Sequence, residues 1–305
     1  MIKKKLGVWL PTRPILRRVS QDNPGIFLDI VVSAILKELK KEFIIIENLD
    51  FRNASIKNGA VFFNDFNASE LDGYFWFSQM NKDADGHDML VLEQLEKSIP
   101  VINPTRGLRI GLDKFKTSSF LQENKIPVPE FALIHKNDEK TIGWIFDNWG
   151  SILVKPRFGA FGVGIFKTDS ADDLLDLIDF SGVDSVYVEK FYKNDASEWC
   201  GINVVGNNIL YAYGKQETKI KGYKVFDRMQ IGGDMVLRHV NAEQKKLALK
   251  IAELIKMGFF GIDLIRSKDG RYLVVDLNTF PGVYPELSDP KKIATEFLRM
   301  IKMWV

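Results

Sequence analysis

Apolar and polar positions along the first hundred residues predict strands and helices that alternate. Short apolar runs predict strands at 6–10, 43–47, 61–63, 71–78 and 99–103. Apolar residues at helical spacing predict helices at 25–41 and 86–97, the first after a start signal at Asp22 to Pro24. Strands that alternate with helices are typical of a parallel sheet covered by helices. No Gly-x-Gly-x-x-Gly follows the first apolar run, so the fingerprint of a dinucleotide-binding fold is absent.

A linker begins at Asn103-Pro104, and beyond it the pattern predicts shorter strands, hairpins and longer loops. Strands are predicted at 152–156, 165–167 and 185–192, and a hairpin at 200–216. Helices are predicted at 112–124, 170–179, 241–257 and 290–303, and an extended segment with two prolines at 126–131. Residues 217–236 carry charges and glycines, which predicts a long surface loop of a kind that is usually functional or mobile in a compact domain.

The most informative segment reads GIDLIRSKDGRYLVVDLNTFPG. Asp269-Gly270 predicts a hairpin turn, which brings Asp263 on the first run alongside the second run. Asp276 and Asn278 lie two residues apart on that second run, so their side chains point to the same face. Three oxygen ligands on rigid strands suit a hard cation such as Mg²⁺. The alternative is a solvated strand face before a turn, but carboxylates that interrupt apolar runs favour the metal site.

A second motif, ILVKPRFGAFGVGIFKT, ends a predicted strand at Lys155 and continues into a loop with Gly159, Gly162 and Gly164. Glycines let backbone N–H groups approach a polyphosphate, and a lysine adds a positive charge for its oxygens. The spacing differs from the Walker pattern. A glycine-rich hairpin without a ligand is the alternative interpretation.

Two further segments are ambiguous by themselves. The run SVYVEKFY is either an ordinary core strand or a strand whose backbone at Lys190 and Phe191 holds the edge of an adenine. Lys114 stands at the start of a predicted helix, where it is either solvated or part of a site.

The order of these motifs resembles the ATP-grasp superfamily over about residues 103–288, and most of all its RimK-like glutamate ligases. The resemblance implies an α/β protein, with an N-terminal parallel-sheet domain followed by an α+β ATP-grasp part in two subdomains. The expected boundaries are 1–103, 104–192 and 193–305. It also implies ATP as the cofactor together with Mg²⁺, for which Mn²⁺ can substitute.

Roles for individual residues follow from the same resemblance. Lys114 and Lys155 would contact the phosphates of ATP, and the loop from Gly159 through Gly162 to Gly164 would close over them. Adenine and ribose would be held by Glu189, Lys190, Phe191 and Glu198. The metal would be bound by Asp263, Asp276 and Asn278, although Asp276 stands where glutamate is commoner in these relatives.

The chain departs from the resemblance at one place. RimK-like relatives carry an arginine in the strand after the adenine hinge, and residues 201–203 include none. The candidate substitutes for this catalytic role are Lys215, Arg228 and Arg238. Trp9, Pro11, Thr12 and Arg13 follow the first strand, at the edge where open α/β sheets bind ligands, and are candidates for acceptor recognition.

Composition narrows the setting in which this chemistry takes place. The 305 residues are 46% hydrophobic and 27% charged, with a formal net charge of +2, which gives no reason to expect nucleic-acid or membrane partners. A single cysteine, Cys200, excludes an intrachain disulfide and fits a reducing compartment. No apolar run approaches the ~20 residues of a membrane helix. We therefore expect a cytoplasmic protein.

The leading hypothesis is an ADP-forming carboxylate–amine ligase that acts on small molecules or peptides. ATP phosphorylates a carboxylate, an amine attacks the acylphosphate, and Arg228 or Arg238 stabilises the oxyanion. One alternative is a kinase on the same scaffold that phosphorylates a hydroxyl, as inositol-phosphate kinases do. Another is a regulatory protein with a degenerate nucleotide site. The relatives that the chain resembles also lead us to expect a homodimer.

Overall fold

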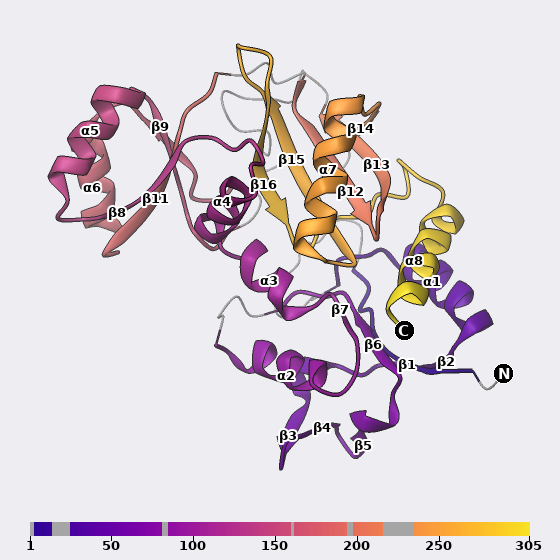
Figure 1. Ribbon diagram of the computed structural model, residues 1–305. Coiled ribbons are helices and arrows are strands. Elements are labelled where there is room, and N and C mark those ends of the chain that lie inside the picture. Colours follow the sequence, from indigo (N-terminus) through magenta and orange to yellow (C-terminus); the bar gives the residue numbers. More distant parts are fainter. Residues whose placement is uncertain (1–2, 14–24, 81–84, 160–161, 194–197, 216–234) are drawn as a thin grey trace.

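The computed structural model describes residues 3–13, 25–80, 85–159, 162–193, 198–215 and 235–305, with Lys215 described by its backbone alone. No helix in these ranges is long and apolar enough to cross a membrane. Figure 1 shows the N-terminal sheet at the bottom, a small lobe projecting to the left, and a larger sheet in the centre.

The N-terminal sheet is parallel, as the alternating pattern predicts. Its strands are β2 (Ile44–Ile46), β1 (Lys5–Trp9), β6 (Gly73–Trp76) and β7 (Val101–Ile102), in that order. Two helices accompany them, α1 (Asp29–Glu42) and α2 (His87–Glu96). Helix α1 begins four residues later than the sequence predicts, because the backbone at 25–28 is still extended and Gly25 bridges to Ser78.

Several small elements lie between β2 and β6 in the chain. An antiparallel sheet consists of β3 (Ser55–Lys57), β4 (Ala60–Phe63) and β5 (Phe66–Asn67), of which the sequence predicts only β4. Two short 3₁₀ helices, Phe51–Asn53 and Ala68–Glu70, precede and follow it.

The last helix, α8 (Pro290–Trp304), returns to pack against α1. Asp289 caps its start, with Oδ1 accepting from the backbone N–H of Lys291 at 2.7 Å. Phe297 is fully buried, and its ring lies 5.6 Å from Phe27 and 5.0 Å from Phe259. This core therefore joins the N-terminal sheet to the C-terminal part of the chain.

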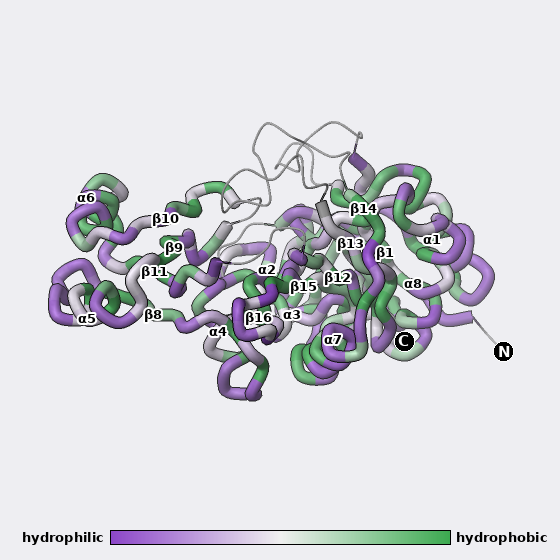
Figure 2. The backbone as a smooth tube through the Cα atoms, turned by 90° about the horizontal axis from the view of Figure 1, so that it is seen from above, coloured by the Kyte–Doolittle hydropathy of each residue, from purple (hydrophilic) through white to green (hydrophobic). Residues whose placement is uncertain are grey.

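The projecting lobe contains a four-stranded sheet in the order β10-β9-β11-β8. Its strands are β8 (Phe131–His135), β9 (Ile152–Lys155), β10 (Phe166–Thr168) and β11 (Ser185–Lys190). Helices α5 (Glu139–Trp149) and α6 (Ala171–Ser181) bury Ile145 and Leu174 against it. Figures 1 and 2 both place this lobe at the opposite end of the molecule from α1 and α8. The sequence pattern predicts neither β8 nor α5. Helix α5 is not predicted because it is rich in residues of modest helix propensity.

The central sheet has five strands in the order β14-β13-β12-β15-β16. They are β12 (Cys200–Val205), β13 (Asn208–Lys215), β14 (Met235–Arg238), β15 (Phe259–Arg266) and β16 (Tyr272–Asn278). Helix α7 (Ala242–Ile255) crosses one face, as Figure 1 shows. Both predicted hairpins are confirmed, and Gly270 in the second turn has a φ of +86° that favours glycine. Of the predicted loop at 217–236, residues 235–236 belong to β14, and the rest lies outside the described residues.

Two helices, not one, lead from the N-terminal sheet into the lobe. They are α3 (Thr105–Gly111) and α4 (Lys114–Glu123), where the sequence predicts a linker and a single helix at 112–124. The break falls at Asp113, whose Oδ1 accepts from the backbone N–H groups of Phe115 at 3.0 Å and Lys116 at 3.4 Å. This cap fixes the first turn of α4, and Lys114 is its first residue.

The predicted boundaries at residues 103 and 192 remain a proposal. Asn103 lies at the first of them and is 2% exposed. Its Nδ2 donates to the carbonyl of Phe259 at 2.6 Å, and its Oδ1 accepts from the backbone N–H of the same residue at 2.9 Å. One side chain thus ties the end of β7 to the start of β15.

We expect Asn103→Ala to lower the free energy of unfolding by about 2–4 kcal/mol, because it leaves a buried N–H and a buried C=O without partners. Urea denaturation measures the change. The control is Asn148→Ala on the exposed side of α5, which should change stability by less than about 0.5 kcal/mol. Equal effects of the two substitutions would contradict the bridging role of Asn103.

Candidate active site

The hairpin of β15 and β16 brings the three predicted metal ligands together on one face of the central sheet. Asp263 lies directly opposite Asp276, and Gly261 lies opposite Asn278. The register shifts just after Asp263, so Val275 is an extra residue on β16. The alternation of the two strands therefore places all three oxygen-bearing side chains on the same side.

Asp263 is the most perturbed of the three. Its Oδ1 is inaccessible to solvent and has no hydrogen-bond partner. Burial and the charge of Asp276 together raise the pKa of this carboxyl to about 8, against the opposing effects of Lys114 and Asn278. A buried carboxylate oxygen without a partner is costly, so this end of the hairpin favours a cation.

Lys114 reaches the same place from the start of α4. Its Nζ lies 2.6 Å from Oδ1 of Asp276. Burial lowers the pKa of Lys114, but the carboxylates of Asp276, Glu189 and Asp263 together raise it above its usual value. The lysine and the aspartate therefore neutralise each other across the gap between two elements that are 162 residues apart in sequence.

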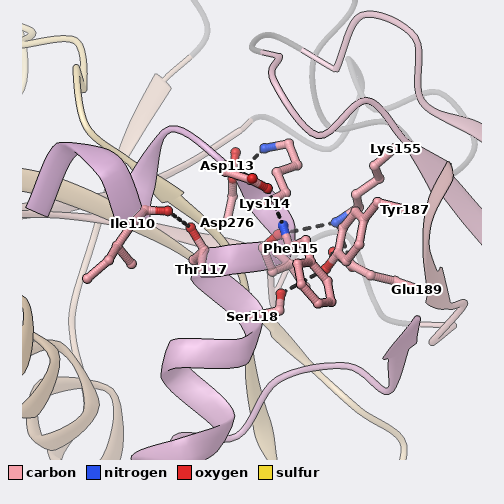
Figure 3. A network of polar contacts seen from close by, with 11 residues as sticks. Ile110, Asp113, Lys114, Phe115, Thr117, Ser118, Lys155, Tyr187, Glu189 and Asp276 are labelled. Carbon is pink, nitrogen blue, oxygen red and sulfur yellow. Dashed lines mark hydrogen bonds and ion pairs between the residues drawn. The ribbon is translucent and has the colours of Figure 1, made fainter. Parts of the chain in front are cut away.

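A second lysine–carboxylate pair lies in the lobe. Nζ of Lys155 is 2.6 Å from Oε2 of Glu189, and both side chains are almost fully buried. The same Nζ donates to the carbonyl of Val275 on β16 at 3.2 Å, which links the lobe to the central sheet. Figure 3 shows both ion pairs converging beside the first turn of α4.

Tyr187 and Ser118 complete this network. The hydroxyl of Tyr187 donates to Oε1 of Glu189 at 2.8 Å and lies 2.8 Å from the hydroxyl of Ser118 on α4. Burial raises the pKa of this phenol well above its usual value, so it stays protonated. Neither residue is among the predicted site residues, although Tyr187 stands two positions before Glu189 and hence on the same face.

A pocket opens between α4, β11 and β16. It is lined by Lys114, Thr117, Ser118, Leu121, Glu189, Val274, Val275 and Asp276. The pocket therefore lies between the two sheets, with both ion pairs in or beside its wall.

The glycine-rich loop connects β9 and β10, although residues 160–161 lie outside the described residues. Gly162 and Gly164 have φ values of +66° and +76°, which favour glycine. A Cβ at Gly164 would also lie 2.7 Å from Cγ of Pro156, whereas one at Gly159 would meet only ordinary contacts. Two of the three glycines are thus required by the local backbone alone.

At the predicted adenine hinge, the backbone N–H groups already have partners. Lys190 donates to the carbonyl of Glu130 at 2.8 Å, and Phe191 donates to that of Ser151 at 2.9 Å. These N–H groups therefore continue the sheet. Glu198, the ribose candidate, is exposed and pairs with Arg266 at 3.1 Å.

Arg238 is the one candidate catalytic cation whose side chain the structure describes, and it is not brought to the hairpin. Arg238 is paired with Ala212, and its Nε lies where a Cβ of Gly214 would be, within 2.3 Å. Tyr213 is paired through Gly201 with Asp263, so these two side chains lie on the same face of the sheet. Gly214 is the next residue after Tyr213 and faces the other side. Arg238 lies over Gly214 and therefore projects from the face opposite Asp263. The structure thus separates Arg238 from the proposed oxyanion. Lys215 belongs to β13 with its side chain undescribed, and Arg228 lies outside the described residues.

The hairpin residues fit a hard divalent cation. They offer two carboxylates and one amide, all oxygen donors, and one carboxylate oxygen lacks a partner. Within the described ranges, no group of three or more His, Cys, Asp or Glu side chains is arranged so that it could hold a metal ion. Cys200 is buried, and burial raises the pKa of its thiol to about 11, which suits a core residue.

Comparisons with known proteins agree with this geometry. Residues 111–301 match the model of the RimK-like ATP-grasp domain, so the chain belongs to the RimK-like ATP-grasp family. The predicted family and fold class are therefore confirmed.

Among curated relatives, a tetrahydromethanopterin:alpha-L-glutamate ligase of Methanocaldococcus jannaschii is 31% identical over 63% of this chain and 66% of its own length. A coenzyme gamma-F420-2:alpha-L-glutamate ligase of Methanococcus maripaludis is 28% identical over 59% of this chain and 63% of its own. The chain thus spans just under two thirds of the length of these relatives.

Two solved structures share the fold over nearly the whole chain. A RimK domain ATP-grasp protein of Sphaerobacter thermophilus aligns with a TM-score of 0.65 at 17% identity, covering 97% of this chain and 98% of that one. D-alanyl-alanine synthetase A of Vibrio cholerae aligns with the same TM-score and identity, covering 100% and 99%.

Removal of the charge of Asp263 should stabilise the protein in the presence of a chelator. The folded pKa lies above the unfolded value of about 3.9, so the native state is increasingly penalised as pH rises from about 4 to about 8. We expect Asp263→Asn to raise the free energy of unfolding by about 1–3 kcal/mol at pH 8.5, with little change at pH 4.5. Urea denaturation in EDTA measures both values. Asp65→Asn, in an exposed turn, serves as the control. A gain that is the same at both pH values would contradict the cause assigned to the shift.

The buried pair of Lys155 and Glu189 should be more sensitive to the loss of one partner than to the loss of both. We expect Lys155→Met to lower the free energy of unfolding by about 3–5 kcal/mol, because an unpaired charge stays buried. The double variant Lys155→Met/Glu189→Leu should recover most of that loss. Denaturant titration of the wild-type protein, Lys155→Met, Glu189→Leu and the double variant completes the cycle, and strictly additive effects would show that the two groups do not interact.

Proposed function

We propose that the protein is an ATP-dependent carboxylate–amine ligase. The observation that carries the proposal is the convergence of Lys114 and Lys155 with Asp263 and Asp276 at one pocket between two sheets. Membership of the RimK-like family supports it, as do the names of relatives, which are ligases.

In the proposed site, ATP lies between the lobe and the central sheet. Lys114 and Lys155 turn from their carboxylates toward the phosphates, and Tyr187 holds Glu189 in place when Lys155 moves. Asp263, Asp276 and Asn278 hold Mg²⁺ or Mn²⁺, which when bound offsets the charge of the phosphate oxygens. The loop that contains Gly162 and Gly164 covers the phosphates and excludes water.

The proposed reaction has two steps. An oxygen of the substrate carboxylate attacks the γ-phosphorus, the bond to the β-phosphate oxygen breaks, and ADP leaves as an acylphosphate forms. An amine then attacks the carbonyl carbon, inorganic phosphate leaves with the electrons of the C–O bond, and the nitrogen loses a proton. Water must be kept out between the steps, because it would compete with the amine.

The proposed substrates are a small molecule or a peptide with a free carboxylate, and an α-amino acid as the amine. L-Glutamate is the first amine to test, since the names of the relatives specify it. A homodimer and a cytoplasmic location are parts of the same proposal, the latter from the single cysteine and the ordinary composition.

Trapping with hydroxylamine tests the acylphosphate step. A panel of amino acids, short peptides and glutamyl conjugates is offered as acids with Mg·ATP and hydroxylamine as the nucleophile. We expect at least one acid to give ADP and a hydroxamate in equal amounts, and Asp276→Asn to lower that rate by a factor of about 10² or more.

The matched control is Asp269→Asn in the turn of the same hairpin, which should keep the wild-type rate. Transfer of phosphate to a hydroxyl, with a stable phosphoester and no hydroxamate from any acid, would contradict the ligase proposal and indicate a kinase.

A further inference from the structure

Tyr213 occupies the surface of the central sheet beside Asp263. Tyr213, Gly201 and Asp263 stand opposite one another on the neighbouring strands β13, β12 and β15. A Cβ at Gly201 would lie 2.5 Å from Cζ of Tyr213 and 2.8 Å from both neighbouring ring carbons. The end of the ring that carries the hydroxyl therefore lies across β12, on the path from Tyr213 to Asp263.

Tyr284 approaches the same place from the segment after β16. A Cβ at Gly282 would lie 2.8 Å from its hydroxyl oxygen, so this ring also lies across a glycine. The two rings meet edge to face, with centroids 5.8 Å apart. Two tyrosines thus use the space that two glycines leave open.

Hydrogen bonds to the side chains of Tyr211 and Asn203 fix the backbone at Gly282 and Tyr284. The hydroxyl of Tyr211 donates to the carbonyl of Gly282 at 3.2 Å and accepts from the N–H of Tyr284 at 3.0 Å. Nδ2 of Asn203, a residue with 0% exposure, donates to the same carbonyl at 2.8 Å. These bonds hold the segment over the sheet, and they leave the hydroxyl of Tyr284 itself uncommitted.

Neither Tyr213 nor Tyr284 has a hydrogen-bond partner for its hydroxyl within the described ranges, although Tyr213 is only 5% exposed. Tyr213 stands in one row with Asp263, and its ring contacts that of Tyr284. Burial raises the pKa of both phenols, and the charge of Asp263 adds to this rise. Arg13, from the carboxyl end of β1, lies close enough to Tyr284 to oppose that rise. Nε of Arg13 donates to the carbonyl of Ile26 at 2.8 Å, which fixes the guanidinium at this edge.

We propose that Tyr213, Tyr284 and Arg13 form the subsite that holds the substrate carboxylate during its activation. The inference rests on the proposed function, because a carboxylate that receives the γ-phosphate must lie beside the ligands of the metal. Two neutral O–H donors and one guanidinium match the single negative charge and the several lone pairs of a carboxylate. The same donors can stay with the oxygen as its charge changes during transfer.

The subsite also offers a hydrogen-bond donor beside residues 201–203, where the chain has no arginine. Gly201 has no side chain there, and the ring of Tyr213 occupies the position instead. Arg238 cannot take the role from where it lies, since it projects from the other face. A phenol therefore supplies a donor at this position of the sheet.

The test compares Tyr213→Phe and Tyr284→Phe with the wild-type enzyme, using the acid that gives the most hydroxamate. We expect each substitution to raise the KM for that acid about tenfold to hundredfold, with the KM for ATP unchanged within twofold. Gly201→Ala keeps both hydroxyls but displaces the ring, and should raise the KM for the acid likewise. Calorimetric titration of the acid in the presence of Mg²⁺ and a non-hydrolysable ATP analogue should give the same ratios.

The matched control is Tyr272→Phe, on β16 but bonded to Asn241 at 2.8 Å, which should leave both KM values unchanged. Unchanged KM for the acid in Tyr213→Phe and Tyr284→Phe, with the wild-type enzyme active, overturns the subsite and leaves the proposed function standing. A wild-type protein that gives no hydroxamate with any acid contradicts the proposed function, and the inference with it.

Discussion

The ion pair between Lys114 and Asp276 is the interaction on which the arrangement of the site depends. It joins the first turn of α4 to the end of strand β16, with Nζ of Lys114 lying 2.6 Å from Oδ1 of Asp276. Lys155 makes a parallel connection, because the same ammonium group contacts Glu189 in the lobe and the carbonyl of Val275 in the central sheet. Charges at low exposure must be paired, so each lysine is held beside its carboxylate.

The rest of the fold positions the two ion pairs, Lys114 with Asp276 and Lys155 with Glu189. Asp113 caps α4 and so fixes the direction in which Lys114 leaves the helix. Asn103 ties the end of the parallel sheet to β15, and the core around Phe297 holds the C-terminal helix against the N-terminal strands. The lobe is connected to this body mainly through the ion pairs and α4, which is consistent with its place at one end of the molecule in Figures 1 and 2.

Local rules were enough to predict the hairpin of β15 and β16. The Asp269-Gly270 turn and the two-residue period of a strand place Asp263, Asp276 and Asn278 together without knowledge of the rest of the fold. The parallel N-terminal sheet followed in the same way from the alternation of its elements. Helix α5 escaped prediction because its propensity is modest and its stability comes from the residues it buries against the lobe.

Contacts that depend on register could not be predicted. The position of Tyr213 across Gly201 follows from the pairing of β12 with β13 and from the absence of a Cβ, neither of which the sequence alone specifies. Arg238 was a candidate because of its charge. The alternation of side chains along β14 places it on the face of the sheet opposite Asp263, which its charge alone could not indicate. The backbone N–H groups of Lys190 and Phe191 are bonded to Glu130 and Ser151, and the adenine-binding role of these residues stays a prediction.

The most direct test of the central claim is the affinity for a non-hydrolysable ATP analogue, measured by calorimetry with and without Mg²⁺ in the wild-type protein and in Asp276→Asn. If Asp276 exchanges Lys114 for a metal when nucleotide binds, Mg²⁺ raises the wild-type affinity at least about tenfold and has little effect on the variant. The variant should also bind the analogue in EDTA at least as tightly as the wild-type protein does, because Lys114 is already free. An equal Mg²⁺ dependence in the two proteins would contradict the account.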